Sequence, residues 1–230
     1  MRKQIFGFIA AAAVLVGTSS SFGAVIADWG FQIVTPADST GTTSGPHNPD
    51  AGAGQALGVH ASSATAWSTP AGNGSTESFS SNNWAVGDYY QFRVSTLGYE
   101  DITVSWHQTG SNTGPRDFTF QYSTNGTTFT NFLDYSITND SWSSTGSPKS
   151  ESIYTANLSA ISALDDQANV YFRLTQRTTV AISSANPVAT GGTGRVDNFV
   201  VNANLIPEPA SLALLAIGGL GLLARRRRSC

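Results

Sequence analysis

Short segments in which apolar and polar residues alternate are the feature that most constrains the fold of this chain. The clearest are 89–95, 101–108 and 117–123, where every second residue is large and apolar. A period of two residues is that of a β-strand with one buried face. Outside the two ends of the chain, no long window repeats with the 3.6-residue period of an α-helix. The sequence therefore predicts an all-β domain.

Weaker alternation predicts the remaining strands. They are placed at 25–33, 57–60, 76–80, 152–158, 169–176 and 195–203, with one helical turn at 159–164. The segment 35–56 is predicted as a loop, because Pro36, Pro46 and Pro49 lie among small polar residues and proline cannot donate to a β-ladder.

An Asn-Gly pair indicates one hairpin. Asn125-Gly126 follows the strand 117–123, and this pair favours a two-residue turn into a next strand at 127–130. About nine or ten short strands joined by loops are typical of a β-sandwich, and we expect one of jelly-roll type over residues 25–204. The aromatic first strand and the last strand resemble the edges of exported jelly-roll modules. In carbohydrate-binding modules of that shape the two strands are neighbours.

Composition limits the chemistry of this domain. Aromatic residues make up 10% of the chain, which supplies a core and argues against disorder. The single cysteine, Cys230, excludes an internal disulfide and a cysteine-based zinc site. Residues 28–206 hold six basic and 14 acidic residues, a net charge of −8. A surface of that sign repels phosphates, so we expect no nucleic-acid partner.

The N-terminus has the pattern of a secretory signal peptide. Arg2 and Lys3 precede an apolar run at 5–16, and small residues follow through 24. A charged start, an apolar centre and a small-residue tail are the three parts of such a signal. We predict a signal peptide over 1–24, followed by export across the cytoplasmic membrane.

The C-terminal segment 205–230 has three consecutive parts. They are the tripeptide Pro207, Glu208 and Pro209, the apolar run 212–224, and the cluster Arg225, Arg226, Arg227 and Arg228. As a single hydrophobic helix the apolar run spans roughly 20 Å, short of the ~30 Å hydrocarbon core, and we predict that it holds the chain in the membrane before processing. The four arginines are predicted to stop transfer and stay cytoplasmic, on the same side as Arg2 and Lys3.

Tripeptide, apolar run, arginine cluster and terminal position together resemble the PEP-CTERM sorting signal of bacterial exported proteins. The resemblance covers only this segment. It implies recognition by an exosortase-type processing enzyme, processing near the tripeptide, and a protein of the cell envelope or the extracellular matrix of a biofilm. The alternative is an ordinary tail anchor.

Motifs for catalysis and metal binding are few. His47, His60 and His107 lack metal-ligand spacing, and no nucleophile motif occurs, so we predict no catalytic residues. Asp197 and Asn198 are candidate oxygen ligands for a structural Ca²⁺, which related jelly-roll modules often hold near their terminal strands. The alternative is a strand-edge aspartate that bonds to a neighbouring loop.

Three tryptophans are the remaining candidates for function. Trp67, Trp84 and Trp142 lie in Ser-, Gly- and Asn-rich segments, where exposed indole rings stack on sugars. The alternative is that they cap the ends of the sandwich. We therefore expect a non-enzymatic exported protein that binds polysaccharide. A secreted hydrolase, marked by paired carboxylates or a His–Asp–Ser cluster in a cleft, and a structural adhesin without a defined ligand are the alternatives.

Overall fold

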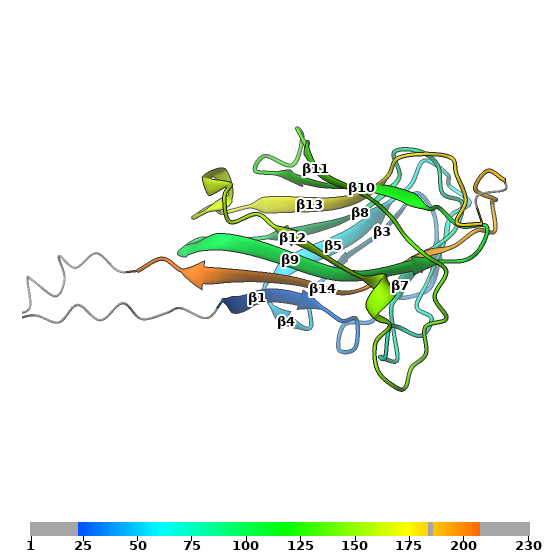
Figure 1. The fold of residues 1–230 in the computed structure, drawn as a ribbon, viewed down its shortest axis with the longest axis horizontal. Helices are drawn as coiled ribbons and strands as arrows, with labels where there is room; N and C mark the ends of the chain where they lie inside the picture. The colour runs from blue at the N-terminus through cyan, green and yellow to red at the C-terminus, as the bar shows by residue number, and fades with distance from the viewer. Residues whose placement is uncertain (1–22, 184–185, 208–230) are drawn as a thin grey trace, which may run out of the picture.

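The described residues of the computed structural model, 23–183 and 186–207, form two antiparallel β-sheets that face each other (Figure 1). The eight-stranded sheet contains β12 (Ile153–Asn157), β9 (Tyr99–Gly110), β14 (Gly194–Leu205), β7 (Phe79–Ser81), β6 (Ala66–Ser68) and β2 (Ser39–Thr40) in that order, with β1 (Ala24–Trp29) beside β14 and β4 (Ala51–Gly52) beside β1. The six-stranded sheet has the order β11 (Thr130–Ser136), β10 (Asp117–Ser123), β13 (Val170–Gln176), β8 (Tyr89–Val94), β5 (Gly54–Val59) and β3 (Thr43–His47). Within these residues the helical elements are two 3-10 turns, η1 (Ser150–Ser152) and η2 (Ser162–Leu164). The predicted all-β sandwich is confirmed.

The two sheets meet through the apolar side chains of alternate strand positions. Tyr90 and Phe92 of β8 are fully buried, as their alternation predicts. Phe92 stacks on Phe199 of the opposite sheet with ring centroids 3.6 Å apart, and Trp29 meets both rings edge-on. Fully burying one such side chain contributes roughly 1.5–3 kcal/mol, so this aromatic layer is a main source of cohesion between the sheets.

The prediction of a loop over 35–56 is wrong in part, because β2, β3 and β4 lie within it. Pro46 is tolerated in β3 because this strand is at the edge of the six-stranded sheet, where no outer neighbour needs its missing N–H. The first strand also ends earlier than predicted. It stops at Trp29, since Phe31 adopts a φ of 57° and turns the chain.

The hairpin between β10 and β11 is confirmed, but its turn is not the predicted two-residue one. Residues 124–129 form a loop, and the second strand begins at 130. The Asn125 carboxamide oxygen accepts the N–H groups of Thr127 and Thr128 at 2.9 Å each. Of the Asn-Gly pair, Gly126 alone has a positive φ, of 72°. The asparagine thus organises the loop through its side chain rather than through a type I′ backbone.

The first and last strands are neighbours, as the resemblance to jelly-roll modules implies: Ala24 of β1 pairs with Ala203 of β14. Consequently β1 begins and β14 ends at one end of the sandwich, which we call the exit end (Figure 1). The predicted signal peptide, except for its last two residues, lies outside the described residues, as do the apolar run 212–224 and the four arginines. Among the residues that the structure does describe, no helix is long and apolar enough to cross a membrane.

Candidate functional site

A cavity of about 490 Å³ lies at the end of the sandwich away from the exit end. It forms where β9 ends and β14 begins, between the loops 111–113 and 139–142. Its lining is mostly polar and includes Arg195, Asp140, Asn112 and Trp142. We call it the Arg195 cavity.

Arg195 is the group that distinguishes this cavity. Its side chain is partly buried, and burial lowers the pKa of its guanidinium. The guanidinium forms no ion pair and no hydrogen bond with any residue that the structure describes. A desolvated cation without a partner costs free energy, because lost water contacts are not replaced. Its donors therefore have no bonded partner among the described residues, and Arg195 lines a cavity of about 490 Å³.

Asp140 and Trp142 are held in place by one hydroxyl. Ser152 donates from its Oγ to Asp140 Oδ2 at 2.5 Å, and it accepts from Trp142 Nε1 at 3.0 Å. Thr109 Oγ1 accepts the N–H of Asp140 at 2.9 Å, which fixes the loop to β9. Asp140, Trp142 and Arg195 thus line one cavity, and Ser152 holds the first two in place.

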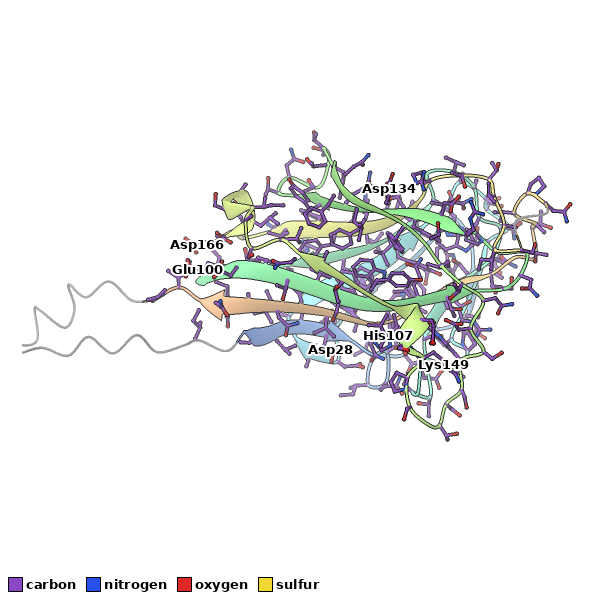
Figure 2. The ribbon with its side chains drawn as sticks, viewed as in Figure 1. Asp28, Glu100, His107, Asp134, Lys149 and Asp166 are labelled. Carbon is purple, nitrogen blue, oxygen red and sulfur yellow. The ribbon has the colours of Figure 1, made fainter. Side chains whose placement is uncertain are left out.

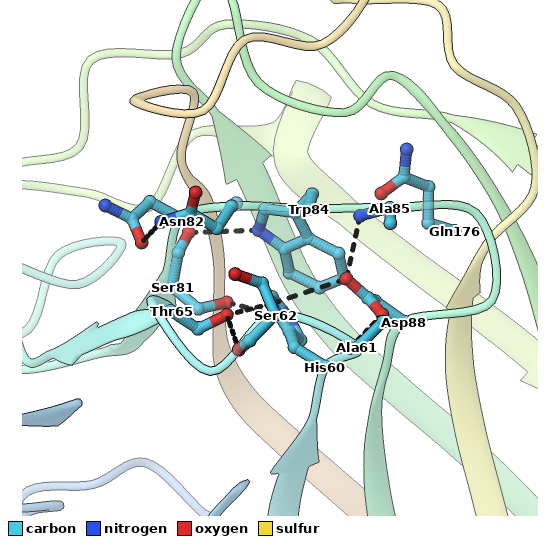
Figure 3. Close-up of polar contacts among 12 residues, drawn as sticks. His60, Ala61, Ser62, Thr65, Ser81, Asn82, Trp84, Ala85, Asp88 and Gln176 are labelled. Carbon is cyan, nitrogen blue, oxygen red and sulfur yellow. Dashed lines mark hydrogen bonds and ion pairs between the residues drawn. The ribbon is translucent and has the colours of Figure 1, made fainter. Parts of the chain in front are cut away.

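A second polar cluster lies inside the sandwich and consists of the three residue types of a catalytic triad (Figure 3). Ser81 Oγ lies 3.3 Å from His60 Nε2, and His60 Nδ1 lies 3.5 Å from Asp88 Oδ2. In a triad the histidine accepts the serine proton, and the aspartate orients the ring. We call this group the His60 cluster.

The hydrogen bonds of the His60 cluster run in the opposite direction to those of a triad. Tyr90 Oη donates to the carbonyl of Gly194 at 2.8 Å, so Ser81 Oγ donates to Tyr90 Oη, also at 2.8 Å. The hydroxyl of Ser81 is therefore committed, and His60 Nε2 donates to it instead of accepting from it. Both oxygens of Asp88 accept backbone N–H groups, at 2.8 and 2.7 Å.

The His60 cluster is also sealed from solvent. Its His, Ser and Asp are each at most 3% exposed. The rings of Trp67 and Trp84 pack on the imidazole with centroids 4.7 and 4.3 Å away. Burial lowers the pKa of His60 to about 4, so the ring is neutral at pH 7. The cluster is a satisfied part of the core.

The expectation that the three tryptophans are exposed is wrong. Trp67 is 1%, Trp84 6% and Trp142 8% exposed. Small neighbours make room for these rings rather than exposing them: Gly58 lies against the ring of Trp67, and a Cβ on Gly194 would lie 3.1 Å from that of Trp84. Trp67 and Trp84 cap the core, which was the stated alternative. Trp142 alone of the three lines the Arg195 cavity.

Asp197 and Asn198 lie at a bulge of β14, where they bond to a loop. Asp197 accepts from Asn73 N at 2.8 Å and from Ser75 Oγ at 2.7 Å, and Asn198 Nδ2 reaches His107 Nδ1 at 3.2 Å. Burial raises the pKa of Asp197 to about 6. Among the described residues, no group of three His, Cys, Asp or Glu side chains is placed to hold a metal ion. This geometry gives the predicted Ca²⁺ site no support.

The end of the chain agrees with a known sorting signal. The profile of the PEP-CTERM protein-sorting motif matches residues 205–228. The chain carries a PEP-CTERM sorting motif. A PEP-CTERM motif implies export, association with the cell envelope or surface, and processing by an exosortase. Of the tripeptide, the structure describes Pro207, which is exposed; Glu208 and Pro209 lie outside the described residues.

Several solved structures resemble the sandwich at low sequence identity. The K3 cleaved adhesin domain of Lys-gingipain from Porphyromonas gingivalis W83 is 12% identical, with 77% of this chain and 98% of that chain covered and a TM-score of 0.41. The N-terminal cellulose-binding domain of β-1,4-glucanase C from Cellulomonas fimi is 12% identical, with 79% of this chain and 90% of that chain covered and a TM-score of 0.30. Endoglucanase 3 of Trichoderma harzianum, from family GH12, is 8% identical, with 82% of this chain and 100% of that chain covered and a TM-score of 0.31. No curated protein matches the chain. These three structures are an adhesin domain, a cellulose-binding domain and an endoglucanase.

Sequence reasoning missed both charged residues of the Arg195 cavity. Arg195 begins the last predicted strand, and Asp140 lies in a loop rich in Ser and Asn. The small number of cations was the signal that could have indicated this site. The domain has six basic residues, and a buried one without an ion-pair partner is a candidate for ligand binding.

Proposed function

We propose that this protein is an exported surface or matrix protein whose sandwich binds a neutral polysaccharide in the Arg195 cavity and catalyses no reaction. The observation that carries the proposal is that Arg195, which has no bonded partner among the described residues, lines one cavity with Asp140 and Trp142. Sugar hydroxyls both donate and accept, so one sugar bonds to the guanidinium and to the carboxylate together. The indole offers an apolar contact for the sugar ring.

The position of the cavity suits a ligand outside the cell. Arg195 and Leu205 lie at opposite ends of β14. Ten residues of strand at ~3.3 Å each separate them by roughly 30 Å. The sorting motif begins at the exit end. The cavity therefore faces away from the segment that the processing enzyme handles.

Charge favours a neutral ligand over an acidic one. Residues 28–206 carry a net charge of −8, which repels uronate-rich polymers at low salt. Asp140 adds a carboxylate to the lining of the cavity, and this carboxylate would repel the carboxylate of an acidic sugar. A neutral polyol meets neither penalty.

Two observations support binding without catalysis. Glycoside hydrolysis uses two carboxyl groups, and Asp140 is the one carboxylate among the described residues that line the cavity. The His60 cluster, the other candidate for hydrolysis, is sealed, and its serine hydroxyl donates to Tyr90. A secreted hydrolase remains the rival proposal, and release of reducing sugar from the bound polymer would favour it.

Affinity electrophoresis in gels that contain neutral polysaccharides tests the proposal. We expect retardation of the wild-type domain that weakens at least about tenfold in Arg195→Met, since a hydrogen bond to a charged group contributes ~1.5–3 kcal/mol. Arg93→Met is the matched control, because Arg93 lies on β8, away from the cavity. Equal retardation of Arg195→Met and wild type contradicts the cavity as the site. Absence of retardation by a panel of neutral and acidic polymers contradicts polysaccharide binding altogether.

A further inference from the structure

The last strand of the sandwich runs directly into the sorting motif. Leu205 of β14 pairs with Tyr99 of β9, and the N–H of Ile206 donates to the carbonyl of Gly98 at 2.9 Å. Pro207, the first residue of the tripeptide, follows at once, and the match to the sorting motif begins at residue 205. The chain has no spacer between the folded sheet and the segment that the enzyme must recognise.

An enzyme that processes a peptide bond holds residues on both sides of it. Such enzymes bind their substrates as extended chain, at ~3.3 Å per residue, with main-chain hydrogen bonds to the strand. On the N-terminal side of Pro207, the N–H of Ile206 already bonds to Gly98, just before β9, and Leu205 and Asn204 already pair with β9 itself. They cannot pair with β9 and with an active site together.

The end of β14 can separate from the sheet beyond Ala203, because its pairing changes there. Pairing of β14 with β1 reaches Ala203, opposite Ala24, and stops there. Residues 204–206 are therefore held on one side only, by β9 and the residue before it, whereas 200–202 pair with strands on both sides. Ala203 is 1% exposed, but Leu205 is 58% exposed. Opening the last three residues exposes little apolar surface, and opening beyond Ala203 exposes the core.

We propose that residues 204–206 are part of the substrate that the processing enzyme acts on, and that they must detach from β9 before the tripeptide can enter the active site. The processing rate is then proportional to the fraction of chains in which this end is open. A strand end held on one side opens readily, so the step slows processing without blocking it. Correct pairing of β14 up to Ala203 keeps the opening confined to the exit end.

The partner turn of β9 stays in place when β14 opens. Asp166 Oδ1 accepts the N–H of Gly98 at 2.8 Å, and Asp166 lies at the exit end together with Glu100 (Figure 2). Asn204 is bonded to this turn region through its Nδ2, which donates to Asp101 Oδ2 at 3.1 Å. The bonds to be broken are thus few and local.

A pair of engineered disulfides tests the proposal in cells that contain the processing enzyme. Glu100→Cys with Asn204→Cys joins directly opposed residues of β9 and β14 and prevents the opening. Thr103→Cys with Asn202→Cys joins the same strands closer to the centre and leaves 204–206 free. Both pairs carry Cys230→Ser to remove the native thiol. Conversion of precursor to processed form is followed by pulse-chase, with and without a reductant.

We expect the Glu100–Asn204 crosslink to slow processing by at least about tenfold, reductant to restore it, and the Thr103–Asn202 crosslink to leave it unchanged. A crosslinked Glu100–Asn204 chain processed at the wild-type rate overturns the proposal. A six-residue Gly-Ser insertion between Ile206 and Pro207 gives a second test that needs no crosslink. Faster processing supports the opening step. Slower processing means that the enzyme docks on the folded exit end, where Leu97 is 57% exposed, and overturns it.

Discussion

The His60 cluster and the Arg195 cavity contain similar residues, but the first is buried in the core and the second lies at the surface. Each combines tryptophan with charged and hydroxyl side chains, and both lie at the start of β14. The carbonyl of Gly194 accepts from Tyr90 within the His60 cluster, and the next residue, Arg195, lines the cavity. Successive residues of a strand face opposite sides of the sheet. The step from residue 194 to residue 195 therefore leads from the sealed His60 cluster to the Arg195 cavity, the proposed binding site.

The difference shows what to look for when a polar cluster is weighed as a site. In the His60 cluster, donors and acceptors satisfy one another, from His60 through Ser81 and Tyr90 to a backbone carbonyl. In the cavity, Arg195 forms no ion pair and no hydrogen bond with any described residue. Residue types alone favour the His60 cluster as the functional site, because it has the composition of a triad. Donors without partners favour the Arg195 cavity as the functional site.

The largest expected effect concerns the tryptophans that seal the His60 cluster. Trp67→Ala should lower the free energy of unfolding by about 3–5 kcal/mol, because it empties a fully buried site against Phe79 and His60. Urea denaturation followed by circular dichroism measures it. Phe132→Ala, at a ring that is 40% exposed, is the control and should cost far less. A loss below ~1 kcal/mol in Trp67→Ala would show that this end of the sandwich is not packed as described.

Sequence alternation predicted most of the sandwich but not its clusters. The strand 117–123 was predicted with the bounds of β10, and 89–95 differs from β8 by one residue. The buried position of Trp67 could not be predicted, because its strand is three residues long and too short to show an alternation of apolar and polar residues. His60, Ser81 and Asp88 meet only through pairings of strands, which local patterns do not encode.

The last strand shows a further limit. Simple alternation from Val196 places Phe199 on the outer face, yet Phe199 is fully buried. A bulge between Asp197 and Val200, with Asn198 at a φ of 46°, shifts the phase by one residue. Arg195 precedes the bulge. Its outward position therefore follows the simple pattern, whereas that of the residues after the bulge does not.

The second prediction uses two buried groups whose titrations oppose each other. His60 has a pKa of about 4 in the folded state against 6.5 unfolded, so its contribution to stability increases as pH rises from 4 to 6.5. Asp197 has a pKa of about 6 against 3.8, so its contribution is lost as pH rises from 3.8 to 6. Each change amounts to about 3 kcal/mol, and over this window the two largely cancel.

Single substitutions should separate the two contributions. Relative to wild type, Asp197→Asn should gain about 3 kcal/mol in stability between pH 4 and pH 6, and His60→Gln should lose a similar amount. Unfolding free energies measured at several pH values, each taken as a difference from wild type, cancel the titration of the other carboxylates. Two variants with the same pH slope as wild type would mean that neither group is desolvated as the structure has it.

The smallest expected effect on stability is that of a substitution at Arg195. It tests most directly whether the Arg195 cavity differs from the His60 cluster. Arg195→Met should lower the free energy of unfolding by no more than ~0.5 kcal/mol, because the guanidinium leaves no bonded partner behind among the described residues. Arg116→Met is the matched variant: Arg116 bonds Asp117 through Nε at 2.8 Å and Nη2 at 3.0 Å, and it holds the pKa of that buried carboxyl well below its usual range. Arg116→Met should therefore lower the melting temperature and keep polysaccharide retardation, whereas Arg195→Met should keep the melting temperature and lose retardation. If Arg195→Met instead unfolds the domain, the arginine serves the core, and the cavity differs from the His60 cluster only in its exposure.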